Sequence, residues 1–385
     1  MLANQTFQIR PLPTLVFGAD SSLDLASHVK ALGRSSALIV TDKGLMASGA
    51  ATVLLEKLAA DGVQVEVFDG VAANPTDENV EAGALRLRAL GDAVVIALGG
   101  GSSMDCGKAI ALLATNGDKV TDLQTRGRKE PGVPVIAVAT TAGTGSETNS
   151  ACVITNTALG RKTYVMHPSI VPVVSVLDPK LTLGLPKYPT ATCGFDVLTH
   201  AIEAFTSART TPYSDCVALG AIELVAKYVR TAVENGSDLE ARSQMLMASS
   251  MAAIAFNVSG LGAAHGTGHA LSARLNAAHG QTLATMLPHV MAYNLDVCAA
   301  KYAQVAQAMG AATPGASIED QAQAAIDAVV ALREDIGITR SICDLGGTDE
   351  LLPLLVGDAL ADGVNLSNAR PVDAQAIEAL YRAAW

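Results

Sequence analysis

Three of the seven histidines in this chain lie close together, in the segment "GLGAAHGTGHALSARLNAAHG" at residues 260–280. His265 and His269 are four residues apart, so on a helix their side chains leave the same face one turn apart. His279 follows at the head of the apolar run "GQTLATMLPHV". Imidazole nitrogens are common ligands of divalent transition metals. The spacing therefore predicts a metal site built on helices.

A second pair of ligand-type residues occurs earlier, in the strongly helical pattern "TATCGFDVLTHAIEAFTS". Asp196 and His200 are again four apart, although an isolated pair of this kind is more typical of a surface salt bridge. Together with the three histidines they make five candidate ligands for about four coordination positions. An H-x-x-x-H helix favours the use of both His265 and His269, but spacing alone does not choose among the five.

The composition restricts the partners that such a site would serve. The chain has 385 residues, a net charge of −11 and no basic run, which argues against nucleic acid or an anionic membrane and favours a small-molecule ligand. The six cysteines are scattered without a C-x-x-C motif, so no disulfide framework or thiolate metal site is expected. No apolar stretch approaches a membrane span, and the start "MLANQTFQIR" lacks a signal-peptide pattern, so we expect a cytoplasmic protein.

The elements that must position these residues fall into two classes along the chain. Five apolar runs between residues 35 and 180 alternate with helix-length segments: "SALIVTD", "VQVEVFD", "AVVIALGGG", "PVIAVATT" and "VPVVSVLDP". They predict an α/β half with a mostly parallel sheet. From residue 189 onward the pattern is helical throughout, with no convincing strand. The predicted fold class is therefore α/β plus all-α, with domains at 1–185 and 186–385.

The glycine-rich turn after one of these strands is the clearest candidate for phosphate binding. Gly99, Gly100 and Gly101 precede Ser102, which opens a helix whose first N–H groups would face a phosphate. A tight turn with no ligand would look similar. The dinucleotide fingerprint G-x-G-x-x-G is missing after the earlier strand, but Asp42 ends that strand. A carboxylate there accepts hydrogen bonds from an adenosine ribose and favours NAD over NADP; the alternative role is a helix N-cap.

A loop rich in hydroxyl side chains follows another strand. The segment "ATTAGTGSETNSACVIT" at 139–155 gathers Thr140, Thr141, Thr144 and Ser146 around two glycines. Such a density of hydroxyl and N–H groups suits contacts to a phosphate or to the nicotinamide ribose, and a purely structural loop is the alternative.

Taken together, four motifs resemble in order and spacing the iron-containing (group III) alcohol dehydrogenases, the family of lactaldehyde reductase and 1,3-propanediol dehydrogenase. The motifs are "GGGSSMDCGKAIA", "TTAGTGSET", "FDVLTHAIEA" and "HGTGHALSARLNAAHGQTLATMLPHVMAYN". The similarity runs nearly end to end and includes "VFGADS" and "NPT". It implies an N-terminal dinucleotide-binding domain and a C-terminal all-helical domain, with the active site in the cleft between them.

The resemblance also assigns roles to individual residues. It implies that Asp196, His200, His265 and His279 bind the metal, and that His269 lies near the nicotinamide and takes part in proton transfer. Phe256 matches an aromatic residue that lines the substrate pocket. The implied contacts to the cofactor are Asp42, Asn74, Gly100, Gly101, Ser102, Thr140, Thr141, Val153, Lys162 and Leu181.

Two departures from the family pattern bear on the substrate. Relatives often carry "EVTPF" or "EVTIN" after the threonine-rich loop, whereas this chain has "ETNSAC", which places Asn149 and Ala151 beside the expected pocket. Arg274 stands where relatives usually have an aromatic or aliphatic residue. An outward-facing helix arginine is a simpler account of it than a contact to an anionic substrate.

The function that the resemblance implies is hydride transfer between NAD(H) and a small alcohol or aldehyde, with the alcohol oxygen on Fe²⁺. Zn²⁺ is the alternative metal, because a site of this kind binds it more tightly. Relatives are commonly dimers or larger homo-oligomers. Two rivals are a dehydroquinate-synthase-like lyase and a metal-dependent hydrolase. Arg274 is the lone cationic residue from 256 to 289, which argues against the highly anionic substrate of the lyase, and a hydrolase has no use for the glycine and threonine loops.

Overall fold

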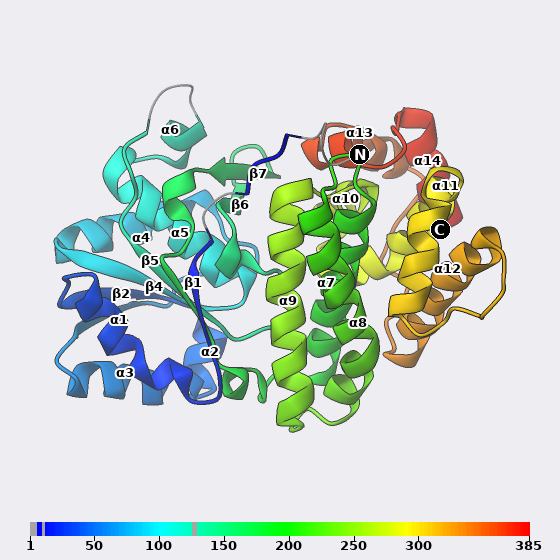
Figure 1. Ribbon diagram of the computed structural model, residues 1–385. Helices are drawn as coiled ribbons and strands as arrows, with labels where there is room; N and C mark the ends of the chain where they lie inside the picture. The colour runs from blue at the N-terminus through cyan, green and yellow to red at the C-terminus, as the bar shows by residue number, and fades with distance from the viewer. Residues whose placement is uncertain (1–5, 10–11, 125–128) are drawn as a thin grey trace. The chain divides into compact units, whose positions relative to one another are not determined.

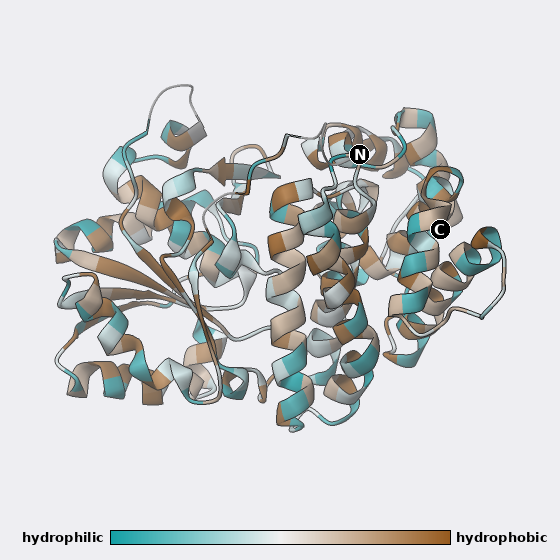
Figure 2. Cartoon of the chain, viewed as in Figure 1, coloured by the Kyte–Doolittle hydropathy of each residue, from teal (hydrophilic) through white to brown (hydrophobic). Residues whose placement is uncertain are grey.

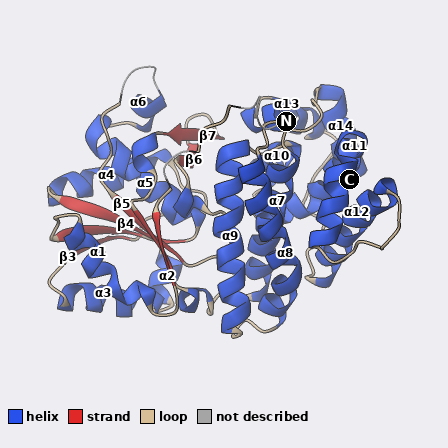
Figure 3. Ribbon diagram, viewed as in Figure 1, coloured by secondary structure: helices blue, strands red, loops and turns tan. Residues whose placement is uncertain are grey.

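The computed structural model describes residues 6–9, 12–124 and 129–385. The chain divides into two compact units: the α/β unit, Leu12–Leu183, and the helical unit, Gly184–Trp385 with residues 6–9. Figure 3 shows that the strands belong to the α/β unit and that the other unit is built from helices.

Six parallel strands form the main sheet of the α/β unit, in the order β1-β8-β5-β4-β2-β3. Figure 1 labels β1, β2, β4 and β5 of this sheet. The strands are β1 (Thr14–Phe17), β2 (Ser36–Val40), β3 (Gln64–Phe68), β4 (Ala93–Gly99), β5 (Val135–Ala139) and β8 (Val174–Leu177). All five predicted strands are present, and the parallel α/β fold is confirmed. β1 was not predicted, because four residues give too short a pattern to distinguish a strand from a loop.

A separate antiparallel hairpin, β6 (Ala151–Asn156) with β7 (Arg161–Met166), was also not predicted. Its first strand continues directly from the threonine-rich loop, and polar residues occupy much of both strands. The helices of this unit are η2 (Ser21–Asp24), α1 (Leu25–Ala31), α2 (Lys43–Ala47), α3 (Ala50–Ala60), α4 (Asp77–Leu90), α5 (Gly101–Asn116), α6 (Val120–Gln124), η3 (Ser146–Thr148), η4 (Pro168–Ile170) and η5 (Pro179–Thr182).

The sheet is buried on both faces because helices cover each of them. One face packs Ile39, Ile96 and Val138 against Val29 of α1 and Leu54 of α3. Helices α4 and α5 contact strands β2 and β4 and pack against each other. The central strands β2, β4 and β5 are accordingly buried, largely apolar runs, brown in Figure 2, as is typical of parallel sheets. All loops at the carboxyl ends of these strands meet along one edge of the sheet, which is where open α/β sheets bind ligands.

The helical unit is built around long helices that pack side by side. Its elements are α7 (Lys187–Thr206), α8 (Pro212–Glu234), α9 (Leu239–Ser259), α10 (Ala263–Leu275), α11 (His279–Ala308), α12 (Ile318–Asp335), α13 (Leu352–Leu360), η6 (Gly363–Ser367) and α14 (Ala374–Ala383). Helix α7 lies at the centre and contacts α8, α9 and α11. In the described part of the chain no single helix is long and apolar enough to cross a membrane; the sharply bent pair α9 and α10 meets that test only jointly, by length and composition.

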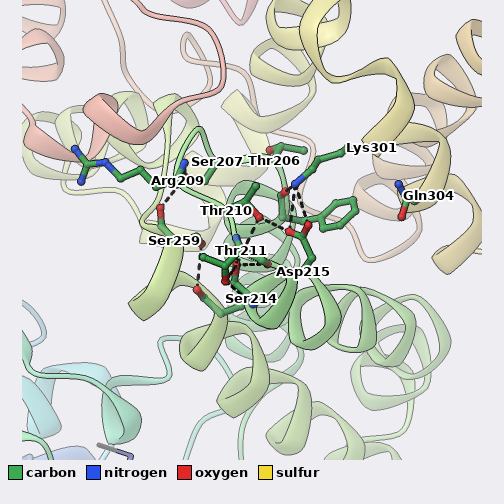
Figure 4. A network of polar contacts seen from close by, with 12 residues as sticks. Thr206, Ser207, Arg209, Thr210, Thr211, Ser214, Asp215, Ser259, Lys301 and Gln304 are labelled. Atoms are coloured by element: carbon green, nitrogen blue, oxygen red, sulfur yellow. Dashed lines mark hydrogen bonds and ion pairs between the residues drawn. The ribbon is translucent and has the colours of Figure 1, made fainter. Parts of the chain in front are cut away.

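A polar network fixes the C-terminal end of α7 (Figure 4). Lys301 of α11 donates to the carbonyl of Phe205, lies 4.6 Å from the centre of its ring and contacts Asp215 of α8 at 3.2 Å. Ser207 donates to the carbonyl of Ser259, the last residue of α9, at 2.6 Å. The carbonyls at a helix C-terminus have no partner within the helix, so these donors satisfy them and hold α7 against α9 and α11.

Candidate metal and cofactor sites

Helix α7 brings the first two candidate ligands together in the interior. Asp196 and His200 are only 3% and 5% exposed, and His200 Nδ1 lies 3.4 Å from Asp196 Oδ1. Their spacing of one helical turn puts both on one face. Because both side chains are buried, the pair is not a surface salt bridge.

Two further histidines approach the same carboxylate oxygen from α10 and α11. His265 Nε2 lies 3.6 Å and His279 Nε2 3.7 Å from Asp196 Oδ1. The first turn of α11 packs closely against α7 because Gly280 has no side chain. A Cβ on Gly280 would lie 1.9 Å from the carbonyl oxygen of Thr192 in α7. Three helices thus converge on one oxygen atom.

The converging atoms fit a divalent cation. Among the described residues, Asp196 Oδ1, His200 Nδ1 and His265 Nε2 are buried with no hydrogen-bond partner. Ligand bonds of about 2.1 Å place tetrahedral ligand atoms about 3.4 Å apart, close to the separations seen here. Asp196, His265 and His279 also offer ligand atoms within 4.8 Å of one another. Buried polar atoms without partners are rare, and a cation would satisfy all three.

Glu203 is a residue of this site that the sequence analysis missed. Its Oε2 lies 2.5 Å from His265 Nδ1, and its Oε1 accepts from the backbone N–H of Ala264 at 2.7 Å. In the neutral form of His265, Nδ1 donates to the carboxylate and the lone pair is at Nε2, toward Asp196. The available signal was position: Glu203 lies seven residues after Asp196, on the same face of α7.

The electrostatics of the cluster follow from burial and from these contacts. Burial lowers the pKa of His200 to about 4, which favours the neutral imidazole that binds metals. Burial alone would raise the pKa of Asp196, but His200, His279 and His265 hold it well below its usual range. Burial alone would lower the pKa of His265, but Glu203 and Asp196 raise it to about 9. An environment that attracts a proton in this way also attracts a metal cation.

His269 has a different setting from its neighbours. Its Nδ1 lies 2.7 Å from Asp362 Oδ2, and its ring stacks on that of His279 with centroids 5.2 Å apart. The other oxygen of Asp362 accepts from Val364 N–H and caps η6. Asp362 was not predicted, because it lies 93 residues along the chain and carries no local pattern. The His269 side chain is 15% exposed, compared with 1% for His265.

Phe256 of α9, predicted to line the substrate pocket, lies beside the cluster. Its ring centroid is 4.6 Å from that of His200. Arg274 makes an ion pair with Asp358 at 2.6 Å and its side chain is 38% exposed, so it is an outward-facing helix arginine.

In the α/β unit, the glycine turn after β4 packs tightly against neighbouring loops. A Cβ on Gly101 would lie 2.6 Å from the Thr144 side chain, and one on Gly100 would lie 3.2 Å from Thr141 Oγ1. Helix α5 begins at Gly101, so its first N–H groups lie at this turn. The Ser102 hydroxyl donates to the carbonyl of Ala73, next to Asn74.

Asp42 follows β2 and faces the same turn. Its Oδ1 accepts from Leu45 N–H at 3.0 Å, so it is the N-cap of α2. Its Oδ2 lies 3.9 Å from where a Cβ on Gly99 would be. The capping role is therefore present, and it leaves the second oxygen beside the glycine turn.

The other predicted cofactor residues vary in their surroundings. Thr140 is buried and donates its N–H to the carbonyl of Gly99 at 3.0 Å, which joins the ends of β5 and β4. Leu181 packs against the core of the sheet, Asn74 is exposed and Lys162 is half-buried. Val153 donates its N–H to Asp105 at 2.8 Å.

Asn149 and Ala151, predicted to lie beside the substrate, both bind a residue that was not predicted. Lys108 of α5 contacts the Asn149 side-chain oxygen at 3.0 Å and the Ala151 carbonyl at 2.6 Å. Lys108 and Asp105 are one helical turn apart in "SSMDCGKAIA", and a charged pair within an apolar helix was the available signal.

Comparison with known proteins connects the two units to one family. Residues 13–179 match the model of the iron-containing alcohol dehydrogenases, and residues 190–385 match that of the C-terminal part of the Fe-containing alcohol dehydrogenase family. The chain belongs to the iron-containing alcohol dehydrogenase family. It is 41% identical to 1,3-propanediol dehydrogenase of Citrobacter freundii and 35% identical to NAD-dependent methanol dehydrogenase of Bacillus methanolicus. These matches cover 96% of this chain in both cases, and 96% and 97% of the respective relatives.

A solved structure of a 1,3-propanediol oxidoreductase has the same fold. Its TM-score is 0.95 at 39% identity, with 99% of this chain and all of that chain covered. As a member of the iron-containing alcohol dehydrogenases, this chain is an NAD-linked oxidoreductase of alcohols and aldehydes. The lyase and hydrolase alternatives are not favoured.

Proposed function

We propose that the chain interconverts a small primary alcohol, diol or hydroxyaldehyde with its carbonyl partner, using Fe²⁺ held by Asp196, His200, His265 and His279. The observation that carries this proposal is the convergence of unpartnered buried atoms on Asp196 Oδ1. A carboxylate with three imidazoles is a suitable ligand set for Fe²⁺, and Zn²⁺ competes for it. When bound, such a metal lowers the pKa of an alcohol and polarises a carbonyl, while NAD accepts or returns the hydride.

The cofactor NAD is proposed to bind along the carboxyl edge of the sheet. We propose that the second oxygen of Asp42 accepts from the adenosine ribose and that the N–H groups at the start of α5 bind the pyrophosphate. The remaining proposed contacts are Asn74, Gly100, Gly101, Ser102, Thr140, Thr141, Val153, Lys162 and Leu181. A carboxylate at position 42 would repel a 2′-phosphate, so NAD is preferred to NADP.

His269 is proposed as the residue that accepts and returns the proton of the reaction. Asp362 receives the hydrogen bond from Nδ1, which orients the imidazole and supports positive charge on it when Nε2 takes up a proton. Phe256, Asn149 and Ala151 are the proposed substrate-binding residues. We further propose a cytoplasmic homo-oligomer, a dimer or larger.

The test is an anaerobic activity screen of the protein reconstituted with Fe²⁺ or with Zn²⁺. C2 to C6 alcohols, diols, hydroxy acids and their aldehydes are offered with NAD(H) and with NADP(H). We expect alcohol-dependent reduction of NAD with Fe²⁺. A clear preference for NADP would overturn the role of Asp42, and tight NADH binding without alcohol-dependent reduction of NAD would revive the lyase.

A further inference from the structure

Helix α5 carries an ion pair between a buried lysine and a half-buried aspartate that the proposed mechanism does not use. Asp105 and Lys108 are three residues apart, and Lys108 Nζ lies 3.4 Å from Asp105 Oδ1. The Lys108 side chain is 1% exposed and that of Asp105 is 15% exposed. A buried ammonium is costly unless its charge and its three N–H groups all have partners.

The partners of Lys108 all lie in the segment between β5 and β6. Its Nζ donates to the Ser146 carbonyl at 2.9 Å, to Asn149 Oδ1 at 3.0 Å and to the Ala151 carbonyl at 2.6 Å. Three donors meet three acceptors, so the side chain holds one short stretch of chain by three bonds.

Asp105 binds the two ends of the same stretch. One oxygen accepts from the Ser146 hydroxyl, and the other accepts from the Val153 backbone N–H at 2.8 Å. The helix that begins at the glycine turn therefore also fixes segment 146–153, through two side chains on adjacent turns.

These contacts determine which atoms Asn149 presents. Its Oδ1 already accepts from Lys108 and from the N–H of Ala151 at 3.0 Å. Among the described residues, both hydrogen bonds of the Asn149 side chain are made by Oδ1, which leaves Nδ2 as the donor, and Asn149 is 6% exposed. The amide cannot turn over without breaking both bonds, so a ligand at this position would meet the Asn149 amide as a hydrogen-bond donor.

Strand order indicates which part of the cofactor this segment meets, given the proposed binding of NAD. The ends of β2, β4 and β5 are adjacent in the sheet, in that order. With the adenosine ribose at Asp42 and the pyrophosphate at the glycine turn, the nicotinamide half continues toward the loop after β5. That loop leads directly into segment 146–153.

We infer that Asp105 and Lys108 are positioning residues that hold segment 146–153 against the nicotinamide half of the cofactor and fix Asn149 as a donor to an oxygen there. The inference rests on the proposed function. The acceptor is an oxygen of the nicotinamide carboxamide or of the alcohol substrate, and the experiment separates these two sources.

The test compares the binding of NADH, ADP-ribose and ADP to the metal-loaded protein by calorimetry. Lys108→Met is expected to lower the affinity for NADH at least tenfold. The affinity for ADP should change less than twofold, because ADP lacks the nicotinamide half. If the acceptor is the carboxamide, Asn149→Ala is expected to lower the affinity for NADH and to leave the affinity for ADP-ribose unchanged. If the acceptor is the substrate, only KM for the alcohol rises.

Two controls keep the outcome decisive. Thr115→Val removes a hydroxyl that donates to the carbonyl of Pro131 at the far end of α5. This variant should have lower thermal stability, but the ratio of its affinities for NADH and ADP should equal that of the wild type. If Lys108→Met does not fold, Asp105→Asn provides the same comparison. Equal losses of affinity for NADH and for ADP, or no loss of affinity in any variant, would overturn this inference and leave the proposed function standing. Failure of the wild type to bind NADH would instead overturn the proposed function.

Discussion

The metal cluster of the helical unit and the Asp105–Lys108 pair of the α/β unit are both buried groups of charged or titratable side chains, yet they are built in opposite ways. Lys108 meets three acceptors of its own chain. Around Asp196, in contrast, three buried atoms have no hydrogen-bond partner among the described residues. A buried group whose atoms are all satisfied fixes the backbone, whereas one with converging unsatisfied atoms is suited to a ligand. Each buried polar atom without a partner lowers the free energy of unfolding by about 1–3 kcal/mol, and a bound cation would offset this cost.

The largest effect should come from removing a converging atom. Asp196→Ala or His200→Ala is expected to abolish metal binding and to lower kcat/KM by more than about 10³, because a metal contributes several kcal/mol to the transition state. Metal content by emission spectroscopy and alcohol-dependent NAD reduction measure this. A variant that retained one metal per chain and its activity would show that the atoms converge for another reason.

A smaller effect is expected from Glu203, which touches the cluster only through His265. Glu203→Gln keeps the shape but weakens the support of the imidazole, so metal affinity should fall about 10–100-fold. Competition with a chelator measures the affinity. Unchanged affinity would mean that the Glu203 contact serves packing alone.

Asp362 tests whether His269 is distinct from the ligands. Asp362→Asn should leave the metal content intact and slow turnover about 10–100-fold, because a general acid–base group contributes about 10²–10⁴ and its orientation is only partly lost. Steady-state rates and metal analysis of the same preparation check this. Loss of metal in this variant would make His269 part of the metal shell.

In the α/β unit, Glu147 differs from Lys108 because one of its buried polar atoms has no partner among the described residues. A substitution of Glu147 should have the smallest effect on activity of those considered. This side chain is 2% exposed, its Oε1 has no hydrogen-bond partner in the described part of the chain, and burial raises its pKa to about 7. A carboxyl whose folded-state pKa is raised stabilises the fold below its unfolded pKa, and this stabilisation is lost as the pH rises through about 7.

Glu147→Gln removes that titration. The stability of the wild type relative to the variant should therefore decrease between pH 5 and pH 8, by up to about 3 kcal/mol. Urea denaturation of both proteins at the two pH values measures the difference. Parallel stability profiles would contradict a titrating Glu147.

The sequence predicted the features that rest on local patterns. Continuous apolar runs identified five strands of the buried parallel sheet. The four-residue spacings indicated Asp196 with His200, and His265 with His269, as candidate ligand pairs, and the site that they form stays a prediction. Spacing could not show that His279 would approach Asp196, since that depends on Gly280 packing against Thr192 of another helix.

The partners of these residues were harder to predict, because long-range contacts bring them together. Asp362 reaches His269 from a separate element near the C-terminus, and no local pattern marks it. Glu203 and Lys108 did lie in recognisable positions, on the same helix face as a ligand and within an apolar helix. Their roles depend on partners that are distant in the sequence: the N–H of Ala264 for Glu203, and segment 146–153 for Lys108.

The most direct test of the account is the metal content of purified His269→Ala, measured alongside His265→Ala and followed by the rate of NAD reduction. His269 is four residues from a proposed ligand on the same helix, yet it binds Asp362. The account predicts that His269→Ala retains one metal per chain and turns over slowly, while His265→Ala loses both metal and activity. A metal-free His269→Ala protein would contradict the assignment of the ligands.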